Sequence, residues 1–146
     1  MKNQKNQEEM AIQYILIVEN GTINRELVTE NLLKDGLLVK YANSAEAALY
    51  TLVKSNPFLI AIDMILPKLD AHTFSNILKN DENTSGIKII AFAKNLFTKP
   101  IVKPFDSLIC TEGKEEILIK GIRNYLATIK PVSTIIFKNT TNEINY

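Results

Sequence analysis

Short apolar runs alternate with segments of helical periodicity along most of the chain. The runs cover residues 14–18, 37–41, 58–63, 87–93 and 105–110. The first of them, YILIV, has no polar alternation, which is typical of a strand covered on both faces. Between and after the runs, apolar residues recur at helical spacing and predict helices over about residues 24–34, 44–54, 71–80 and 114–129.

Each predicted helix carries an apolar stripe that we expect to face a core. Ser44 is a typical N-cap residue, and the pair Asp35 and Gly36 is a typical helix stop. The inward positions that the spacing predicts are Leu27, Val28, Leu32, Ala48, Leu49, Leu52, Val53, Phe74, Ile77, Leu78, Leu118, Ile122, Tyr125, Leu126 and Ile129.

Residues 94–104 interrupt the regular alternation. This segment contains Pro100 and Pro104 and has room for at most a couple of helical turns, so we expect a shortened or irregular fourth helix. Five strands that alternate with helices predict an α/β fold with a parallel sheet covered on both faces, because each crossover helix must pack back on the sheet. The predicted architecture is the flavodoxin-like, doubly wound, five-stranded (βα)5 fold.

The chain of 146 residues has the length of one domain. We expect a polar N-terminal arm over residues 1–11, the domain over residues 12–130 and a C-terminal extension over residues 131–146. The extension holds a short β-like run at 133–137, for which three outcomes stay open: packing on the domain, pairing with a second copy, or disorder.

Composition narrows the classes of partner. With 17 basic and 16 acidic residues the formal net charge is +1, which argues against a binder of nucleic acid or of a membrane surface. The single cysteine, Cys110, excludes an internal disulfide and a thiolate metal cluster, as suits a reducing cytosol. The polar start and the lack of a stretch of about 18 apolar residues argue against secretion and membrane insertion. We therefore expect a cytoplasmic protein.

Two apolar runs end on a carboxylate. Glu19 follows the first run and Asp63 ends the third. In open parallel sheets the ligand site lies beyond the carboxyl ends of the strands, so these two acids are expected at the functional edge. Two neighbouring carboxylates repel unless a cation lies between them, and Mg²⁺ is the simplest hard cation with oxygen ligands. The alternative, that each acid merely caps the loop that follows it, stays open on these grounds.

Three stretches carry a resemblance to a known family. They are ILIVENGTINREL at 15–27, IAIDMILPKLDA at 60–71 and IIAFA at 89–93. In this order they resemble the receiver domain of two-component response regulators, over about residues 12–130. The match is most specific after Asp63, where Pro67 and Asp70 fall where the family has its proline and its Asp-Gly pair.

The resemblance implies a signalling module that is not an enzyme. In it, Asp63 would accept a phosphoryl group from a histidine kinase or phosphotransfer protein and become an aspartyl phosphate. Glu19, Asp63 and the backbone carbonyl of Ile65 would bind Mg²⁺, with Asn20 at the second acidic position. A stand-alone receiver would then act on a downstream protein, with a second copy of the chain as a further partner and with no direct contact to nucleic acid or membrane.

Three positions depart from the family pattern. Asn20 replaces an acid, so Mg²⁺ should bind weakly or not at all; Ala93 replaces a Ser or Thr hydroxyl; and Thr111 stands where the family has a lysine. Lys99 and Lys103 each precede a proline, but they follow the fourth strand too closely for a parallel crossover. Whether Lys99, Lys103 or Lys114 reaches Asp63 stays open.

Two other functions remain as alternatives. The altered positions fit a pseudo-receiver, an interaction module that works without phosphorylation. The loop 20–24 after the first strand would allow a flavodoxin-like flavin binder, although Glu19 and Asp63 would repel its phosphate. His72 is the only histidine, which excludes a histidine metal cluster, and we expect it at the surface.

Overall fold

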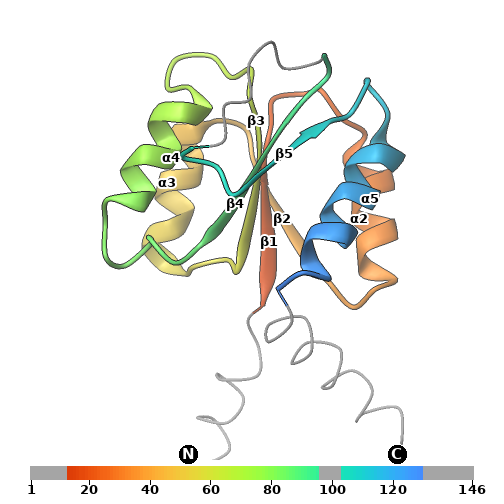
Figure 1. The fold of residues 1–146 in the computed structure, drawn as a ribbon, viewed down its shortest axis with the longest axis horizontal. Coiled ribbons are helices and arrows are strands. Elements are labelled where there is room, and N and C mark those ends of the chain that lie inside the picture. Colours follow the sequence, from red (N-terminus) through yellow and green to blue (C-terminus); the bar gives the residue numbers. More distant parts are fainter. Residues whose placement is uncertain (1–12, 96–102, 130–146) are drawn as a thin grey trace, which may run out of the picture.

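The computed structural model describes residues 13–95 and 103–129 (Figure 1). The strands are β1 (Tyr14–Val18), β2 (Leu38–Ala42), β3 (Leu59–Asp63), β4 (Lys88–Ala93) and β5 (Ser107–Cys110). The helices among these residues are α2 (Arg25–Leu33), α3 (Ala45–Lys54), α4 (Ala71–Lys79) and α5 (Glu115–Leu126). The strands form one parallel sheet in the order β2-β1-β3-β4-β5. The predicted fold class is confirmed.

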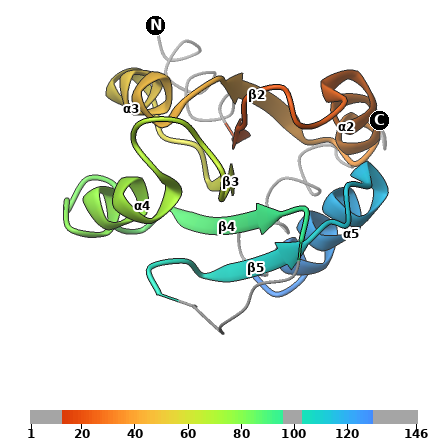
Figure 2. The same ribbon diagram turned by 90° about the horizontal axis from the view of Figure 1, so that it is seen from above.

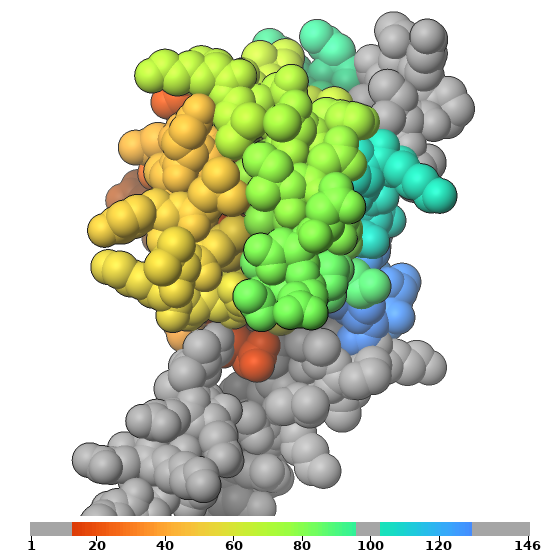
Figure 3. All heavy atoms as spheres, turned by 90° about the vertical axis from the view of Figure 1, so that its left-hand side faces the viewer, coloured from red at the N-terminus to blue at the C-terminus, as the bar shows by residue number. Residues whose placement is uncertain are grey.

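Helices cover both faces of the sheet. Seen from above in Figure 2, α3 and α4 lie on one side and α2 and α5 on the other. Figure 3 shows α3 and α4 next to each other across their face of the molecule. Each side has its own core: Phe74 and Leu78 of α4 pack in one cluster with the sheet, and Val28 and Leu118 pack in the other. No helix among the described residues has both the length and the apolar character needed to cross a membrane.

The central strands deliver their last residues to one edge. All five residues of β1 and all five of β3 are buried. Val18 pairs with Ile62, so Glu19 and Asp63, the next residue on each strand, lie side by side. Asp63 also pairs with Phe92 of β4. The carboxyl ends of β1, β3 and β4 therefore meet at one place.

Side chains define where the helices begin. Asn24, Ser44 and Asp70 are the N-caps of α2, α3 and α4, and each side chain accepts a hydrogen bond from the backbone N–H three residues on. The bond from Thr73 N–H is 2.7 Å long and holds the pKa of the Asp70 carboxyl below its usual value. These caps fix the points at which the loops leave the sheet edge.

Three of the predicted inward positions are wrong. Leu27, Val53 and Ile77 are 38%, 82% and 43% exposed. In α3, the residues against the sheet are the small Ala45 and Ala48, with the larger apolar side chains around the rim. Because α3 approaches through alanines, Val53 is turned to solvent although its neighbour along the chain packs on the core.

The last helix lies unusually close to the last strand. A methyl group in place of a hydrogen of Gly121 would lie 2.4 Å from Ile109 Cδ1, inside contact distance. The irregular fourth helix predicted within 94–104 falls largely outside the described residues. The predicted terminal segments, 1–11 and 131–146, fall outside them altogether, so the predicted domain boundaries stay predictions.

Candidate functional site

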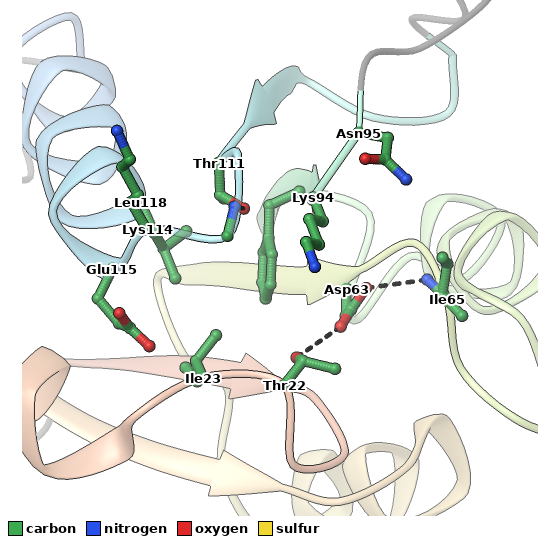
Figure 4. A pocket seen from close by; sticks show the side chains of 12 residues that line it. Thr22, Ile23, Asp63, Ile65, Lys94, Asn95, Thr111, Lys114, Glu115 and Leu118 are labelled. Carbon is green, nitrogen blue, oxygen red and sulfur yellow. Dashed lines mark hydrogen bonds between the residues drawn. The ribbon is translucent and has the colours of Figure 1, made fainter.

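A pocket of about 200 Å³ opens where the strands end. Its lining includes Thr22, Asp63, Ile65, Lys94, Thr111 and Lys114 (Figure 4). Asp63 is the last residue of β3, and the others come from the segments that follow β1, β3, β4 and β5. The pocket therefore lies at the edge where a doubly wound sheet places its ligand.

Asp63 forms the floor of this pocket and is 5% exposed. Its Oδ2 accepts a hydrogen bond of 2.8 Å from Thr22 Oγ1, and its Oδ1 accepts one of 2.9 Å from Ile65 N–H. A carboxylate has about four lone-pair sites, so each oxygen can accept a further bond. Asp63 takes part in none of the ion pairs found among the described residues.

Glu19 is fully buried and is closed in by two neighbours. Its Oε1 accepts a bond of 2.7 Å from Thr22 N–H, and its Oε2 is paired with Arg25 Nε. Burial would raise the pKa of Glu19, but the hydrogen bonds from Arg25 and Thr22 and the charge of Arg25 together lower it below its ordinary value. Glu19 is therefore held as a paired carboxylate.

Arg25 is fixed in this place by several contacts. One guanidinium nitrogen donates to Glu19 O at 3.0 Å and to Asn43 Oδ1 at 2.7 Å. The Tyr41 ring lies under the guanidinium, 4.7 Å from its carbon to the ring centre. Since the cation is held from three sides, it acts as a built-in counter-charge for Glu19.

This donor set fits Mg²⁺ poorly. The ion would need carboxylate oxygens freed from Arg25 and Thr22, whereas the only other side-chain donor predicted here is the neutral, exposed Asn20. With Arg25 against Glu19, the acidic pair offers a divalent cation one net negative charge rather than two. Within residues 13–95 and 103–129, no cluster of three His, Cys, Asp or Glu side chains could hold a metal ion.

The two altered positions on β4 and β5 are joined to each other. Thr111 N–H and Thr111 Oγ1 both donate to Ala93 O, at 2.8 and 3.3 Å. Thr111 Oγ1 also accepts a bond of 3.2 Å from Gly113 N–H. The buried Thr111 hydroxyl therefore organises the turn after β5 and is not directed at Asp63.

The lysines around the pocket differ from those considered from the sequence. Lys99 lies outside the described residues, and Lys103 does not line the pocket. Lys114 lines it, but Figure 4 shows its amine extending away from Asp63. Lys94 lines the pocket with its amine directed toward Asp63 (Figure 4).

Sequence reasoning missed Thr22, Arg25 and Lys94. Lys94 directly follows the altered Ala93, and Arg25 begins the helix after Glu19, so their positions along the chain were a usable signal. His72 is exposed, as predicted, and its ring meets Phe105 edge-on at 6.1 Å between centres.

Comparison with known proteins supports the class that the fold indicates. No protein-family model matches the chain. The chain is 30% identical over 118 residues to RpaA of Synechocystis sp., which is named as a DNA-binding dual master transcriptional regulator. The aligned region covers 80% of this chain and 47% of that protein. It spans 14% of the length of a second curated relative. The chain thus spans less than half the length of these two curated relatives.

Solved structures of response regulators have the same fold. The phosphorylated cyanobacterial phytochrome response regulator RcpA matches with a TM-score of 0.68 and 20% identity, over 79% of this chain and 91% of that one. TrrA of Thermotoga maritima, solved in complex with Mg²⁺-BeF, matches with a TM-score of 0.64 and 19% identity, over 77% and 98%. The resemblance to receiver domains of two-component response regulators is confirmed.

Proposed function

We propose that this domain is a phosphorelay receiver in which Asp63 accepts a phosphoryl group from a histidine kinase or a phosphotransfer protein. The observation that supports it is the state of Asp63: a carboxylate on the floor of an open pocket, with no ion pair to any residue that the structure describes. A structural neighbour, RcpA, was solved in its phosphorylated form. The neighbouring Glu19, in contrast, is closed by Arg25.

In the transfer, one Asp63 oxygen forms a bond to phosphorus while the bond between phosphorus and the donor's leaving atom breaks. The electron pair of the broken bond leaves with the donor. Thr22 Oγ1 and Ile65 N–H hold the carboxylate in place and leave the pocket side open. Because Arg25 neutralises Glu19, the incoming phosphoryl group meets less repulsion.

Mg²⁺ has a smaller part in this proposal than in the family pattern. TrrA was solved with Mg²⁺-BeF, so a metal is expected of such a site. Here the pairing of Glu19 and the neutral Asn20 reduce what the site offers a divalent cation. We therefore propose weak Mg²⁺ binding, and signalling through contact with a downstream protein.

A second candidate is a pseudo-receiver that binds a partner without phosphorylation. Position 93 has no hydroxyl, and the Thr111 hydroxyl is committed to Ala93 O and to Gly113 N–H. These features remove two groups that the receiver resemblance associates with the phosphoryl group. They favour a fixed surface over a switched one.

Phosphorylation by a small donor separates the two candidates. The full chain is incubated with acetyl phosphate, with and without Mg²⁺, and its intact mass is followed for the gain of one phosphoryl group. The adduct should form in the wild type and be lost in Asp63→Asn, while Asp70→Asn, an exposed carboxylate in the next loop, keeps it. No adduct in the wild type would leave the pseudo-receiver as the function.

A further inference from the structure

The cation that the family pattern would supply to the phosphoryl group is missing from its usual position. An aspartyl phosphate carries about two negative charges at neutral pH, about one more than the carboxylate that it replaces. Arg25 is committed to Glu19, and the residue at the family's lysine position is the neutral Thr111. A cation for the phosphoryl oxygens must therefore come from another element.

We propose that Lys94, from the end of β4, is the phosphoryl-binding cation of this site; the inference rests on the proposed function of Asp63. Phe92 pairs with Asp63 across the sheet, and Lys94 follows Phe92 by two residues. Side chains two apart along an extended chain point to the same side. Both Phe92 and Lys94 accordingly line the pocket that contains Asp63.

The turn after β5 holds the Lys94 side chain in place. Lys94 O accepts a hydrogen bond of 3.0 Å from Glu112 N–H, which ties its backbone to that turn. A Cβ on Gly113 would lie 3.3 Å from Lys94 Cε and 3.7 Å from Lys94 Cγ. The lysine stem therefore runs over the face of Gly113, in space that a side chain at 113 would take.

Gly113 suits this role for a second reason. Its φ of +76° is in the left-handed region that glycine adopts without strain. The family has its lysine in the turn after β5; here that turn has Gly113, which packs against the stem of Lys94. The proposed cation therefore follows β4 rather than β5, and these two strands are paired.

The Lys94 amine and the Asp63 carboxylate face each other without touching. Figure 4 shows the amine directed at Asp63, yet the two form no ion pair. The space between them belongs to the pocket. An oxygen of a phosphoryl group on Asp63 would lie in that space and accept a charge-assisted hydrogen bond from the amine.

Anion binding tests this inference without requiring phosphoryl transfer. The parent protein is the full chain with Asp63→Asn, which removes the carboxylate that would repel a free anion. Inorganic phosphate is titrated into it while the amide resonances of Gly113 and Lys94 are followed by NMR. Adding Lys94→Met should weaken binding about tenfold, because a charge-assisted hydrogen bond is lost. Lys94→Arg should restore most of the affinity.

Lys88→Met is the matched control, since Lys88 is exposed at the opposite end of β4 and its loss changes the net charge equally. It should leave phosphate affinity unchanged. Equal affinity in the Lys94→Met and Lys88→Met proteins, or no saturable phosphate binding in the parent, would overturn the inference.

The outcome for the proposed function is read separately, from the acetyl phosphate reaction of the unmodified chain. If phosphate binds through Lys94 but no Asp63 adduct forms, the phosphoryl-acceptor function fails and the anion site stands. If the adduct forms as fast in Lys94→Met as in the wild type, the function stands and the role of Lys94 is refuted.

Discussion

Glu19 and Asp63 end neighbouring parallel strands, yet their surroundings differ completely. Glu19 is sealed by Arg25 and by Thr22 N–H, and no part of it is exposed. Asp63 has one hydrogen bond on each oxygen, a pocket in front of it and no ion pair with any residue of 13–95 or 103–129. Two carboxylates at equivalent strand ends therefore differ: Glu19 is paired with a cation, whereas Asp63 faces a pocket, where we propose that it accepts the phosphoryl group.

The difference originates in the loops rather than in the strands. The loop after β1 turns directly into α2, which brings Arg25 back onto Glu19. The loop after β3 brings only the Ile65 N–H onto Asp63 before α4 begins at Ala71, and both Asp63 and Ile65 line the pocket. The two loops thus give the two carboxylates different surroundings.

The largest expected effect is on stability when Arg25 is removed. Arg25→Met leaves the buried Glu19 carboxylate without a cation, and unfolding free energy should fall by about 2 kcal/mol, less than for a fully buried pair because Arg25 is partly exposed. Urea unfolding measures the loss.

Arg123→Met provides the comparison, because Arg123 pairs with Asp35 where both side chains are partly exposed. It should cost about 0.5 kcal/mol. Lys94→Met, on the open side of the pocket, should also stay within about 0.5 kcal/mol. Equal losses for Arg25 and Arg123 would mean that Glu19 does not depend on its cation.

A double substitution should create a metal site around Glu19. Asn20→Asp adds a carboxylate and Arg25→Met frees Glu19, so the dissociation constant for Mg²⁺ should fall by about tenfold or more relative to the wild type. Titration calorimetry with MgCl₂ measures it. Asn80→Asp, at the end of α4, combined with Arg123→Met lowers the net charge by the same two units elsewhere and should have no effect. Wild-type affinity already equal to that of the double variant would show that Arg25 does not oppose the metal.

The Thr22 hydroxyl lies between Glu19 and Asp63 and should contribute less to stability than Arg25 does. It lies 2.8 Å from Asp63 Oδ2 and 3.3 Å from Glu19 Oε1, and its single hydrogen favours the shorter contact. Thr22→Val should lower the unfolding free energy by about 1 kcal/mol, whereas Thr22→Ser, which keeps the hydroxyl, should cost less. A serine variant as unstable as the valine variant would assign the loss to packing instead.

The smallest effect is a pH dependence from Glu19. Its pKa is lower in the folded protein than in the unfolded chain, so the unfolded chain takes up the proton first as pH falls. The stability that the Glu19 carboxylate contributes is therefore complete above its ordinary pKa of about 4.3 and is lost as pH drops through the folded value.

Urea unfolding of wild type and Glu19→Gln over a pH series measures this contribution. The difference in unfolding free energy between wild type and Glu19→Gln should be constant near neutral pH and should shrink in acid. Glu30→Gln, an exposed carboxyl change on α2, serves as the reference. A difference that stays constant into strong acid would show that Glu19 is not stabilised in its charged form.

Much of the fold could be predicted because burial on both faces leaves a clear signal. The run YILIV matches β1 residue for residue, since a central parallel strand has no solvent side. Predictions for the helices were less accurate. Val53 and Ile77 have the right composition for a core, but the direction from which a helix approaches the sheet, set in α3 by Ala45 and Ala48, is not visible in its spacing.

The site could be predicted only in part. That Glu19 and Asp63 lie together follows from the strand order β2-β1-β3-β4-β5, which the receiver resemblance implies but the alternation of elements alone does not fix. The positions of Arg25 and Lys94 depend on side-chain direction and on distant partners. Lys94 is supported by Gly113, nineteen positions further along the chain, and no local pattern links the two.

Gly121 has a consequence for the pocket although it does not line it. It lets α5 rest directly on Ile109 of β5, and the first turns of that helix supply Glu115 and Leu118 to the pocket wall. The missing methyl group in the middle of α5 thus allows the helix that carries part of the pocket wall to pack closely on β5. A larger residue at 121 would move the helix outward and act as a spacer, widening the pocket without changing any group that faces it.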